Sequence, residues 1–302
     1  MVDKILKVLL FSTQNGLLKA LPNTLRKYYE NVEATNDYII AKGNEVGVIA
    51  HLDTVHKRPP TEDSLYYDKK KNTLWSPDGL GADDRAGIYI ILKLISSGAR
   101  PTVIFTTNEE VGALGAQALI NAHPDNYLNL KYLIELDRQG TQDCVFYKCR
   151  NSKFETFVES YGFRTTWGTF SDISIIAPKW GIAAVNLSVG YFDEHSYAER
   201  LNLTCLHNTL EKVKQMIADI DNTPSFEFTG EINLNIYNQQ CAMCASYVRE
   251  DEVFPVRGTT GTLQNLCIDC YCSLSKYIEW CDICNCAYLN YTKGGCPRCT
   301  KK

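Results

Sequence analysis

Short apolar runs that read as buried strands alternate with amphipathic helical patterns over the first 220 residues. The expected strands are residues 46–53, 101–107, 132–136, 144–148 and 183–187. The expected helices are residues 3–12, 22–34, 84–96, 111–122, 152–161 and 204–220, and residues 61–75 read as a hairpin or loop. This alternation predicts an α/β fold whose central sheet is mostly parallel and is flanked by helices.

Polar side chains follow three of the expected strands directly. His51 and Asp53 end the first strand, Glu109 and Glu110 follow the second, and Asp137 follows the third. In parallel sheets, sites form at the carboxyl ends of the strands. We therefore expect these five side chains to lie along one edge of the sheet.

An acidic, glycine-rich stretch at residues 76–87 precedes the expected helix 84–96. It contains Asp83 and Asp84 at the point where the loop turns into the helix. Glycines let the backbone approach a small ligand closely, and adjacent carboxylates repel each other, which favours a cation beside them. The alternative for this stretch alone is an acidic loop with an aspartate N-cap.

Two histidines and several carboxylates at strand ends suit zinc, whose usual ligands include imidazole nitrogen and carboxylate oxygen. A carboxylate can bridge two metals, and two metals about 3.5–4 Å apart can clamp both oxygens of a hydrolytic transition state. Each piece has an ordinary explanation alone, since Glu109 and Glu110 could compensate a helix dipole and a loop histidine such as His195 is usually exposed. The ordered set favours a two-metal site.

The order of these motifs resembles the di-zinc exopeptidase superfamily, which includes peptidase T, the aminoacylase and carboxypeptidase relatives, and several aminopeptidases. The resemblance covers about residues 45–215. It is carried by HLDTV at 51–55, GADDRAG at 81–87, NEEVG at 108–112, Asp137, and HSxxE at 195–199. It implies a zinc-dependent metallopeptidase or amidohydrolase acting on a peptide or an N-acyl amino acid.

The resemblance also implies a set of metal ligands. Asp83 would bridge the two metals, His51 and Asp137 would complete one site, and Glu110 and His195 would complete the other. Two catalytic Zn²⁺ ions are expected, with Co²⁺ or Mn²⁺ as substitutes.

Two further residues receive roles from the same resemblance. Glu109 would be the general base that takes a proton from the attacking water. Asp53 would lie behind His51 and orient its ring.

The spacing departs from that of the larger relatives. Few residues separate Asp137 from His195 or His51 from Asp83, so the chain lacks the lid or inserted domain that those relatives carry. A catalytic domain without a lid favours an aminopeptidase, and a deacylase of N-acyl amino acids or a carboxypeptidase-like amidohydrolase is the alternative.

Three residues are candidates for contact with the substrate. Arg138 could hold a carboxylate or pair with a nearby acid. Asp172 could contact the substrate amine, although Ser171 and Asp172 also suit a helix cap. Glu199 could contact the amine, cap the following helix or brace the ligand loop.

Ten of the thirteen cysteines lie between residues 241 and 299, which marks a domain boundary near residue 222. We expect a catalytic domain at 1–222 and a Cys-rich zinc-binding domain at 223–302. The pairs suit about two structural zinc ions, and the second half resembles a zinc ribbon. The Cys-x-x-Cys pairs are Cys241 and Cys244, Cys267 and Cys270, Cys281 and Cys284, and Cys296 and Cys299. Sequential and interleaved pairing both remain open.

Composition narrows the partners and the compartment. The formal net charge of −4 gives no general attraction to nucleic acid or to an anionic membrane. The N-terminus reads as an amphipathic helix rather than a signal peptide, so we expect a cytoplasmic protein. The zinc module suits oligomer contact or a protein partner. An alternative of another class is a zinc-ribbon interaction protein on an inactive hydrolase scaffold, which the intact Glu109 and ligand set disfavour.

Overall fold

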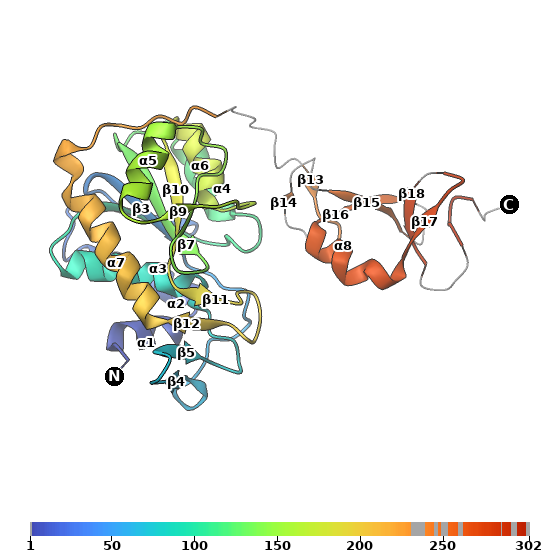
Figure 1. The fold of residues 1–302 in the computed structure, drawn as a ribbon, viewed down its shortest axis with the longest axis horizontal. Helices are drawn as coiled ribbons and strands as arrows, with labels where there is room; N and C mark the ends of the chain where they lie inside the picture. The colour runs from blue at the N-terminus through green and yellow to red at the C-terminus, as the bar shows by residue number, and fades with distance from the viewer. Residues whose placement is uncertain are drawn as a thin grey trace. The chain divides into compact units, whose positions relative to one another are not determined.

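The structure is a computed structural model that describes residues 2–230, 239–244, 247–248, 253–258, 262–284, 286–290 and 295–299. The chain divides into two compact units, Met1–Ile232 and Asn233–Lys302 (Figure 1). The division falls at residue 232, whereas the jump in cysteine content predicts a boundary at residue 222.

The first unit is built on an eight-stranded sheet with the order β1-β2-β6-β3-β7-β10-β8-β9. Its strands are β1 (Val32–Ala34), β2 (Tyr38–Ala41), β3 (Asn44–His51), β6 (Pro101–Thr106), β7 (Tyr132–Arg138), β8 (Asp143–Val145), β9 (Arg164–Thr165) and β10 (Ala184–Ser188). The four central strands β6, β3, β7 and β10 run parallel to one another. Antiparallel pairs join β2 to β6 and β8 to β10 at their two sides. The predicted α/β fold with a mostly parallel sheet is confirmed.

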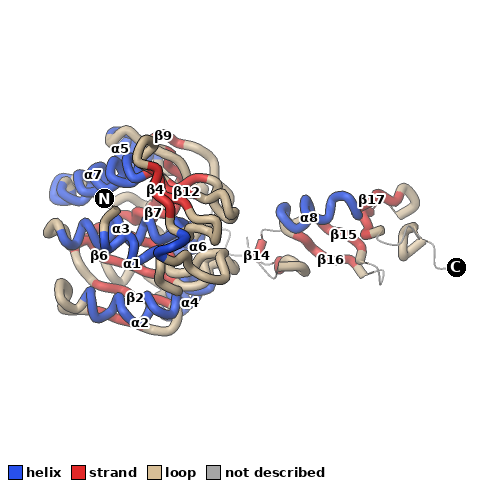
Figure 2. Tube along the Cα trace, turned by 90° about the horizontal axis from the view of Figure 1, so that it is seen from below, coloured by secondary structure: helices blue, strands red, loops and turns tan. Residues whose placement is uncertain are grey.

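Helices cover both faces of this sheet (Figure 2). They are α1 (Lys4–Leu10), α2 (Gln14–Leu25), α3 (Ala82–Ser96), α4 (Leu114–Ala122), α5 (Ser152–Ser160), α6 (Asp172–Trp180) and α7 (Leu203–Ala218), followed by the 3₁₀ turn η2 (Ile220–Asn222). Alternate residues of each strand point to opposite faces. Val48 therefore packs in the core beneath α3 and α7, while its neighbour Ile49 packs in the core beneath α4 and α6.

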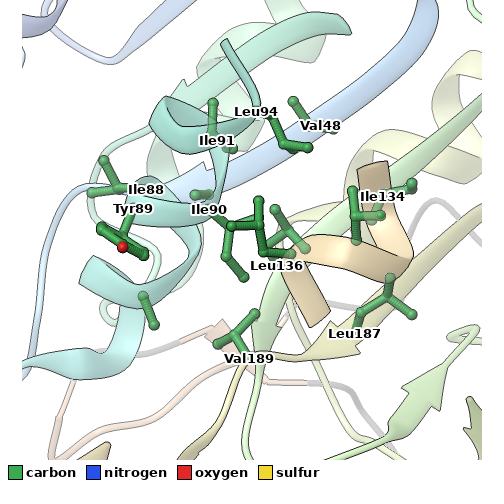
Figure 3. Packing of buried hydrophobic residues seen from close by; sticks show 14 of the residues in the cluster. Val48, Ile88, Tyr89, Ile90, Ile91, Leu94, Ile134, Leu136, Leu187 and Val189 are labelled. Atoms are coloured by element: carbon green, nitrogen blue, oxygen red, sulfur yellow. The ribbon is translucent and has the colours of Figure 1, made fainter. Parts of the chain in front are cut away.

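Helix α3 is buried along nearly its whole length, which fixes the loop in front of it. Ile88, Ile91 and Leu94 are fully buried and gather with Val48 and Ile134 of the strands (Figure 3). A side chain at Gly87 would collide with the carbonyl oxygen of Leu136. The glycine thus allows the start of α3 to approach β7 closely.

A second, antiparallel sheet with the order β11-β12-β5-β4 lies in the same unit. Its strands are β4 (Tyr66–Asp68), β5 (Thr73–Trp75), β11 (Tyr191–Phe192) and β12 (Arg200–Asn202), and the 3₁₀ turn η1 (Glu62–Ser64) precedes β4. The chain leaving β5 leads to Asp83, and the connection between β11 and β12 carries His195. The pairing of β5 with β12 therefore links two segments that carry candidate ligands.

The expected helix at 22–34 is wrong. Helix α2 ends at Leu25, and residues 32–34 form β1, which pairs with residues 39–41 of β2. Antiparallel pairing with the next strand, β2, overrides the helical pattern there. The sequence patterns also do not predict β2 or most of α6, although Ser171 is the N-cap of α6 as its sequence context suggests.

The second unit contains a four-stranded sheet with the order β16-β15-β18-β17 and a separate β13–β14 pair. Its elements are β13 (Gln239–Gln240), β14 (Tyr247–Val248), β15 (Phe254–Arg257), β16 (Leu263–Leu266), α8 (Ile268–Leu274), the 3₁₀ turn η4 (Ser275–Tyr277), β17 (Ile278–Cys281) and β18 (Cys286–Leu289). Its core is small, with Val256, Leu266 and Ala287 beside two buried cysteines. A core of this size is marginal without further crosslinks.

Across the part of the chain that the structure describes, no helix combines the length and the apolarity needed to cross a membrane.

Candidate metal centre

The carboxyl ends of three central strands bring the predicted polar residues together. His51 is the last residue of β3, and Asp137 is the penultimate residue of β7. Glu109 and Glu110 follow β6, the other neighbour of β3. Parallel strands end at the same edge of a sheet, so adjacent strand ends hold these side chains within reach of one another.

The carboxylate of Asp83 lies between the two candidate histidine ligands. Its Oδ1 is 3.0 Å from Nε2 of His51, and its Oδ2 is 3.2 Å from Nε2 of His195. Asp137 Oδ1 lies 3.4 Å from the same nitrogen of His51, and Glu110 Oε2 lies 3.0 Å from that of His195. Two groups, each of one histidine and one acid, therefore share Asp83.

Asp84 belongs to the same centre but is engaged with the backbone. It is fully buried, and its carboxylate accepts hydrogen bonds from the N–H groups of His51 at 3.2 Å and Gly87 at 2.9 Å. One of its oxygens also lies within 4.8 Å of a ligand atom of His51 and of a ligand atom of Asp137. Asp84 thus ties the start of α3 to the end of β3.

The centre concentrates buried negative charge. Burial, together with the charge of Asp83, raises the pKa of Asp137 to about 7. Burial and the same charge raise the pKa of Glu110, whose Oε1 is buried and has no hydrogen-bond partner. Hydrogen bonds to Asp83 and Glu110 raise the pKa of His195 to about 11. Cations between these groups would offset the repulsion, and the mixture of imidazole and carboxylate suits zinc.

Asp53 holds both the first histidine and the glutamate pair in place. Its Oδ1 lies 3.2 Å from Nδ1 of His51 and accepts a hydrogen bond from the N–H of Glu109 at 3.0 Å. Its Oδ2 accepts a hydrogen bond from the N–H of Glu110 at 3.1 Å. One carboxylate therefore fixes the ring of His51 relative to the backbone that carries Glu109 and Glu110.

Glu109 lies beside the candidate ligands. Burial raises the pKa of its carboxyl group well above the ordinary value; the charge of His51 lowers it, and that of Asp137 raises it. A raised pKa suits a group that must accept a proton during the reaction.

The three predicted substrate contacts lie in different surroundings. Asp172 is fully buried and accepts a hydrogen bond from the hydroxyl group of Thr106. Glu199 is also buried and bonds to the loop that carries Asp83. These positions do not favour a substrate contact for either acid. Arg138 donates a hydrogen bond to the carbonyl of Trp167 at 3.4 Å. Among the described residues, Arg138 forms no ion pair.

Further residues around Asp137 were missed by the sequence analysis. The hydroxyl of Tyr191 donates to Asp137 Oδ1 at 3.0 Å, and the side chain of Asn186 bonds to the backbone of Asp137 at both N–H and C=O. Ser171 bridges the carboxylates of Asp137 and Glu135. These residues lie on separate strands and a helix start, so no local spacing in the sequence reveals them.

The second unit brings its cysteines into two groups of four. One holds Cys241, Cys244, Cys267 and Cys270, and the other holds Cys281, Cys284, Cys296 and Cys299. The structure thus shows the sequential grouping, and within each group the sulfur atoms lie within 4.8 Å of one another. Burial raises the pKa of Cys241, but hydrogen bonds from the backbone at Cys244 and Cys267 lower it to about 6. The clusters fit a zinc-binding module.

Comparisons with known proteins agree with the geometry. The family model of Peptidase family M28 matches residues 35–169. This range includes four of the five candidate metal ligands but not His195 or the Cys-rich unit. A search of curated proteins found no match.

Solved structures share the fold at low identity. The aminopeptidase PepT from Bacillus cereus is 16% identical with a TM-score of 0.53, and the alignment covers 72% of this chain and 97% of that one. A tripeptidase from Staphylococcus aureus is 14% identical with a TM-score of 0.55, covering 72% and 97%. The TET1 peptidase from Pyrococcus horikoshii, described as assembling into a tetrahedron or a large octahedral shell, is 13% identical with a TM-score of 0.51, covering 68% and 94%.

Together these findings confirm the predicted resemblance to the zinc exopeptidases. The chain shares the α/β fold of solved aminopeptidases, and its residues 35–169 match the model of Peptidase family M28.

The double role of Asp53 can be tested with Asp53→Asn. The carboxylate of Asp53 accepts hydrogen bonds from the N–H groups of Glu109 and Glu110. In the variant, the amide NH₂ group would face at least one of these donors and could not accept from it. We expect metal affinity and peptidase activity to fall by about 10–100-fold, as for other residues that orient a ligand. Metal titration and kcat/KM report the two effects. Asp219→Asn is the control, because that carboxylate bonds to Tyr161 and to no candidate ligand; an equal loss in both variants would contradict the assignment.

Proposed function

We propose that the chain is an exopeptidase of the aminopeptidase type that cleaves a peptide bond with a water activated between two zinc ions. The observation that supports it most directly is the position of Asp83. Its two oxygens lie 3.0 Å and 3.2 Å from nitrogens of two different histidines. A carboxylate in that position suits a bridge between two metals.

His51 and Asp137 would hold one ion together with Asp83, and Glu110 and His195 would hold the other together with Asp83. Cobalt or manganese could substitute for zinc at both positions. When bound, the ions supply Lewis-acid polarisation and lower the pKa of water. The side chains of Asp83, Asp137 and Glu110 are 8%, 9% and 7% exposed, so little of each ligand is in contact with bulk solvent.

Glu109 then moves the proton. Its carboxylate takes a proton from the attacking water and delivers it to the leaving amine. Asp53 keeps the backbone of Glu109 in position through the hydrogen bond of 3.0 Å. Asp53 therefore positions both Glu109 and the ligand His51.

Arg138 favours a second candidate function. Among the described residues, its guanidinium group forms no ion pair. Arg138 also follows the candidate ligand Asp137 directly in the sequence. A guanidinium group with no carboxylate partner among the described residues suits a substrate carboxylate. This observation favours the carboxypeptidase-like or deacylase alternative, in which the substrate carboxylate lies beside the metals.

The Cys-rich unit is proposed to hold two structural zinc ions, one in each group of four cysteines. Binding of zinc to thiolates contributes directly to folding free energy, which this small core needs. Cysteine pairs that hold zinc in place of disulfides are typical of a reducing compartment such as the cytoplasm. We propose that the unit serves oligomer contact or a protein partner.

The role of Glu109 can be tested with Glu109→Gln. The amide keeps the shape of the side chain but cannot accept the proton. We expect turnover to fall by about 10²–10⁴-fold or more, while both catalytic zinc ions stay bound. Asp83→Asn should instead lose metal and activity together. Zinc content and kcat measure these outcomes, and the roles of the two glutamates would be reversed if Glu109→Gln lost zinc while Glu110→Gln kept it.

The choice between substrate ends can be tested with matched peptides. An aminopeptidase binds a free α-amine beside the metals, so acetylation removes that contact and adds bulk. We expect an unblocked dipeptide or tripeptide to be cleaved and its N-acetyl form to resist. Equal hydrolysis of both forms would favour the deacylase or carboxypeptidase alternative.

A further inference from the structure

We infer that Glu199 is a positioning residue that holds three segments of the candidate metal centre in register. The inference rests on the proposed function only in taking Asp83 and His195 as metal ligands. Of the three roles that the sequence leaves open for Glu199, it selects the one in which this residue braces the ligand loop.

The carboxylate of Glu199 has a protein partner at each oxygen. Its Oε2 accepts a hydrogen bond from the N–H of Gly81 at 2.7 Å and lies 3.0 Å from Nε2 of His56. Its Oε1 accepts a hydrogen bond from the N–H of Asp83 at 2.9 Å. With only 1% of its surface exposed, the residue has little access to a substrate.

These contacts join three segments that are distant in the sequence. His56 follows the strand end that carries His51 and Asp53, and Gly81 lies in the loop that leads to Asp83. Glu199 itself ends the connection that carries His195. A single buried carboxylate therefore fixes the relative positions of segments that supply ligands to both proposed metal sites.

His56 is enclosed on two sides by the same segments. A side chain at Gly79 would collide with its ring, so that glycine allows the loop to pack directly on the imidazole. The ring of Tyr197, two residues before Glu199, lies with its centroid 5.9 Å from that of His56. Packing thus limits the directions in which His56 can present Nε2 to Glu199.

The segment that carries His195 needs such an anchor. Asp193 and His195 have φ angles of 55° and 59°, in the left-handed region that costs energy for residues other than glycine. His195 is also exposed, with 55% of its side-chain surface accessible. Neighbouring packing at His195 is therefore weak, and the buried end of the connection at Glu199 supplies the restraint.

A carboxylate is required because it only accepts hydrogen bonds. Two backbone N–H groups and a histidine nitrogen approach Glu199 from different directions. In Glu199→Gln one terminal atom becomes an NH₂ donor, which would face at least one backbone N–H. The substitution changes hydrogen-bonding character while nearly conserving volume.

The test is a Co²⁺ titration of metal-depleted, full-length protein carrying Glu199→Gln. Absorption bands of cobalt at His and carboxylate ligands are read separately from the sulfur charge-transfer bands of the cysteine sites. We expect the affinity of the His and carboxylate sites to fall by about 10–100-fold. The cysteine sites should keep the affinity of the parent protein, and KM for a free tripeptide at saturating metal should not change.

Glu33→Gln is the matched control, because Glu33 also pairs with a histidine, His123 Nε2 at 3.1 Å, but contacts no candidate ligand. It should leave metal affinity unchanged. His56→Gln retains a donor toward Glu199 and should lose less affinity than His56→Ala. Thermal unfolding of each metal-depleted variant checks that the comparison is made on folded protein.

Two results would overturn the inference. If Glu199→Gln kept its metal affinity but showed a raised KM for free peptides, Glu199 would be assigned to substrate binding. An equal loss of affinity in Glu33→Gln would show a general loss of stability. If the parent binds cobalt at the His and carboxylate sites but hydrolyses no peptide, the proposed function fails while the positioning role of Glu199 stands.

Discussion

The contact on which the candidate site depends is the carboxylate of Asp83 between two histidines. His51 comes from the end of a central strand, and His195 comes from a connection of the small antiparallel sheet. The two histidines are far apart in the sequence, and each lies beside a different oxygen of the Asp83 side chain. The placement of Asp83 at the start of the buried helix α3 therefore determines whether the two halves of the centre can form.

Much of the remaining polar structure restrains that contact. Asp84 ties the helix start to the N–H of His51, Asp53 ties His51 to the backbone of the glutamate pair, and Glu199 accepts from the N–H of Asp83 itself. Charged acceptors that bond to backbone N–H groups form stronger hydrogen bonds than neutral ones. The acids at this edge thus fall into two groups: those directed at the proposed metals and those that hold the backbone.

The sequence was sufficient to predict the parallel sheet and the identity of the strand-end residues, because both depend on local apolar runs and the residues that follow them. It could not predict β1, where pairing with β2 overrides a helical pattern, or the contacts of Tyr191 and Asn186 with Asp137. It also left the role of Glu199 open, since spacing places this residue near His195 but does not show which direction its carboxylate faces. Such partners are set by how elements pack, and that information is spread over the whole fold.

The most direct test of the account is a crystal structure of the zinc-loaded protein with anomalous scattering recorded at the zinc edge. Two peaks should flank the carboxylate of Asp83, one next to His51 and Asp137 and the other next to His195 and Glu110. A single peak at this centre, or a peak held by Asp84 in place of Asp83, would contradict the proposal that Asp83 bridges two metals.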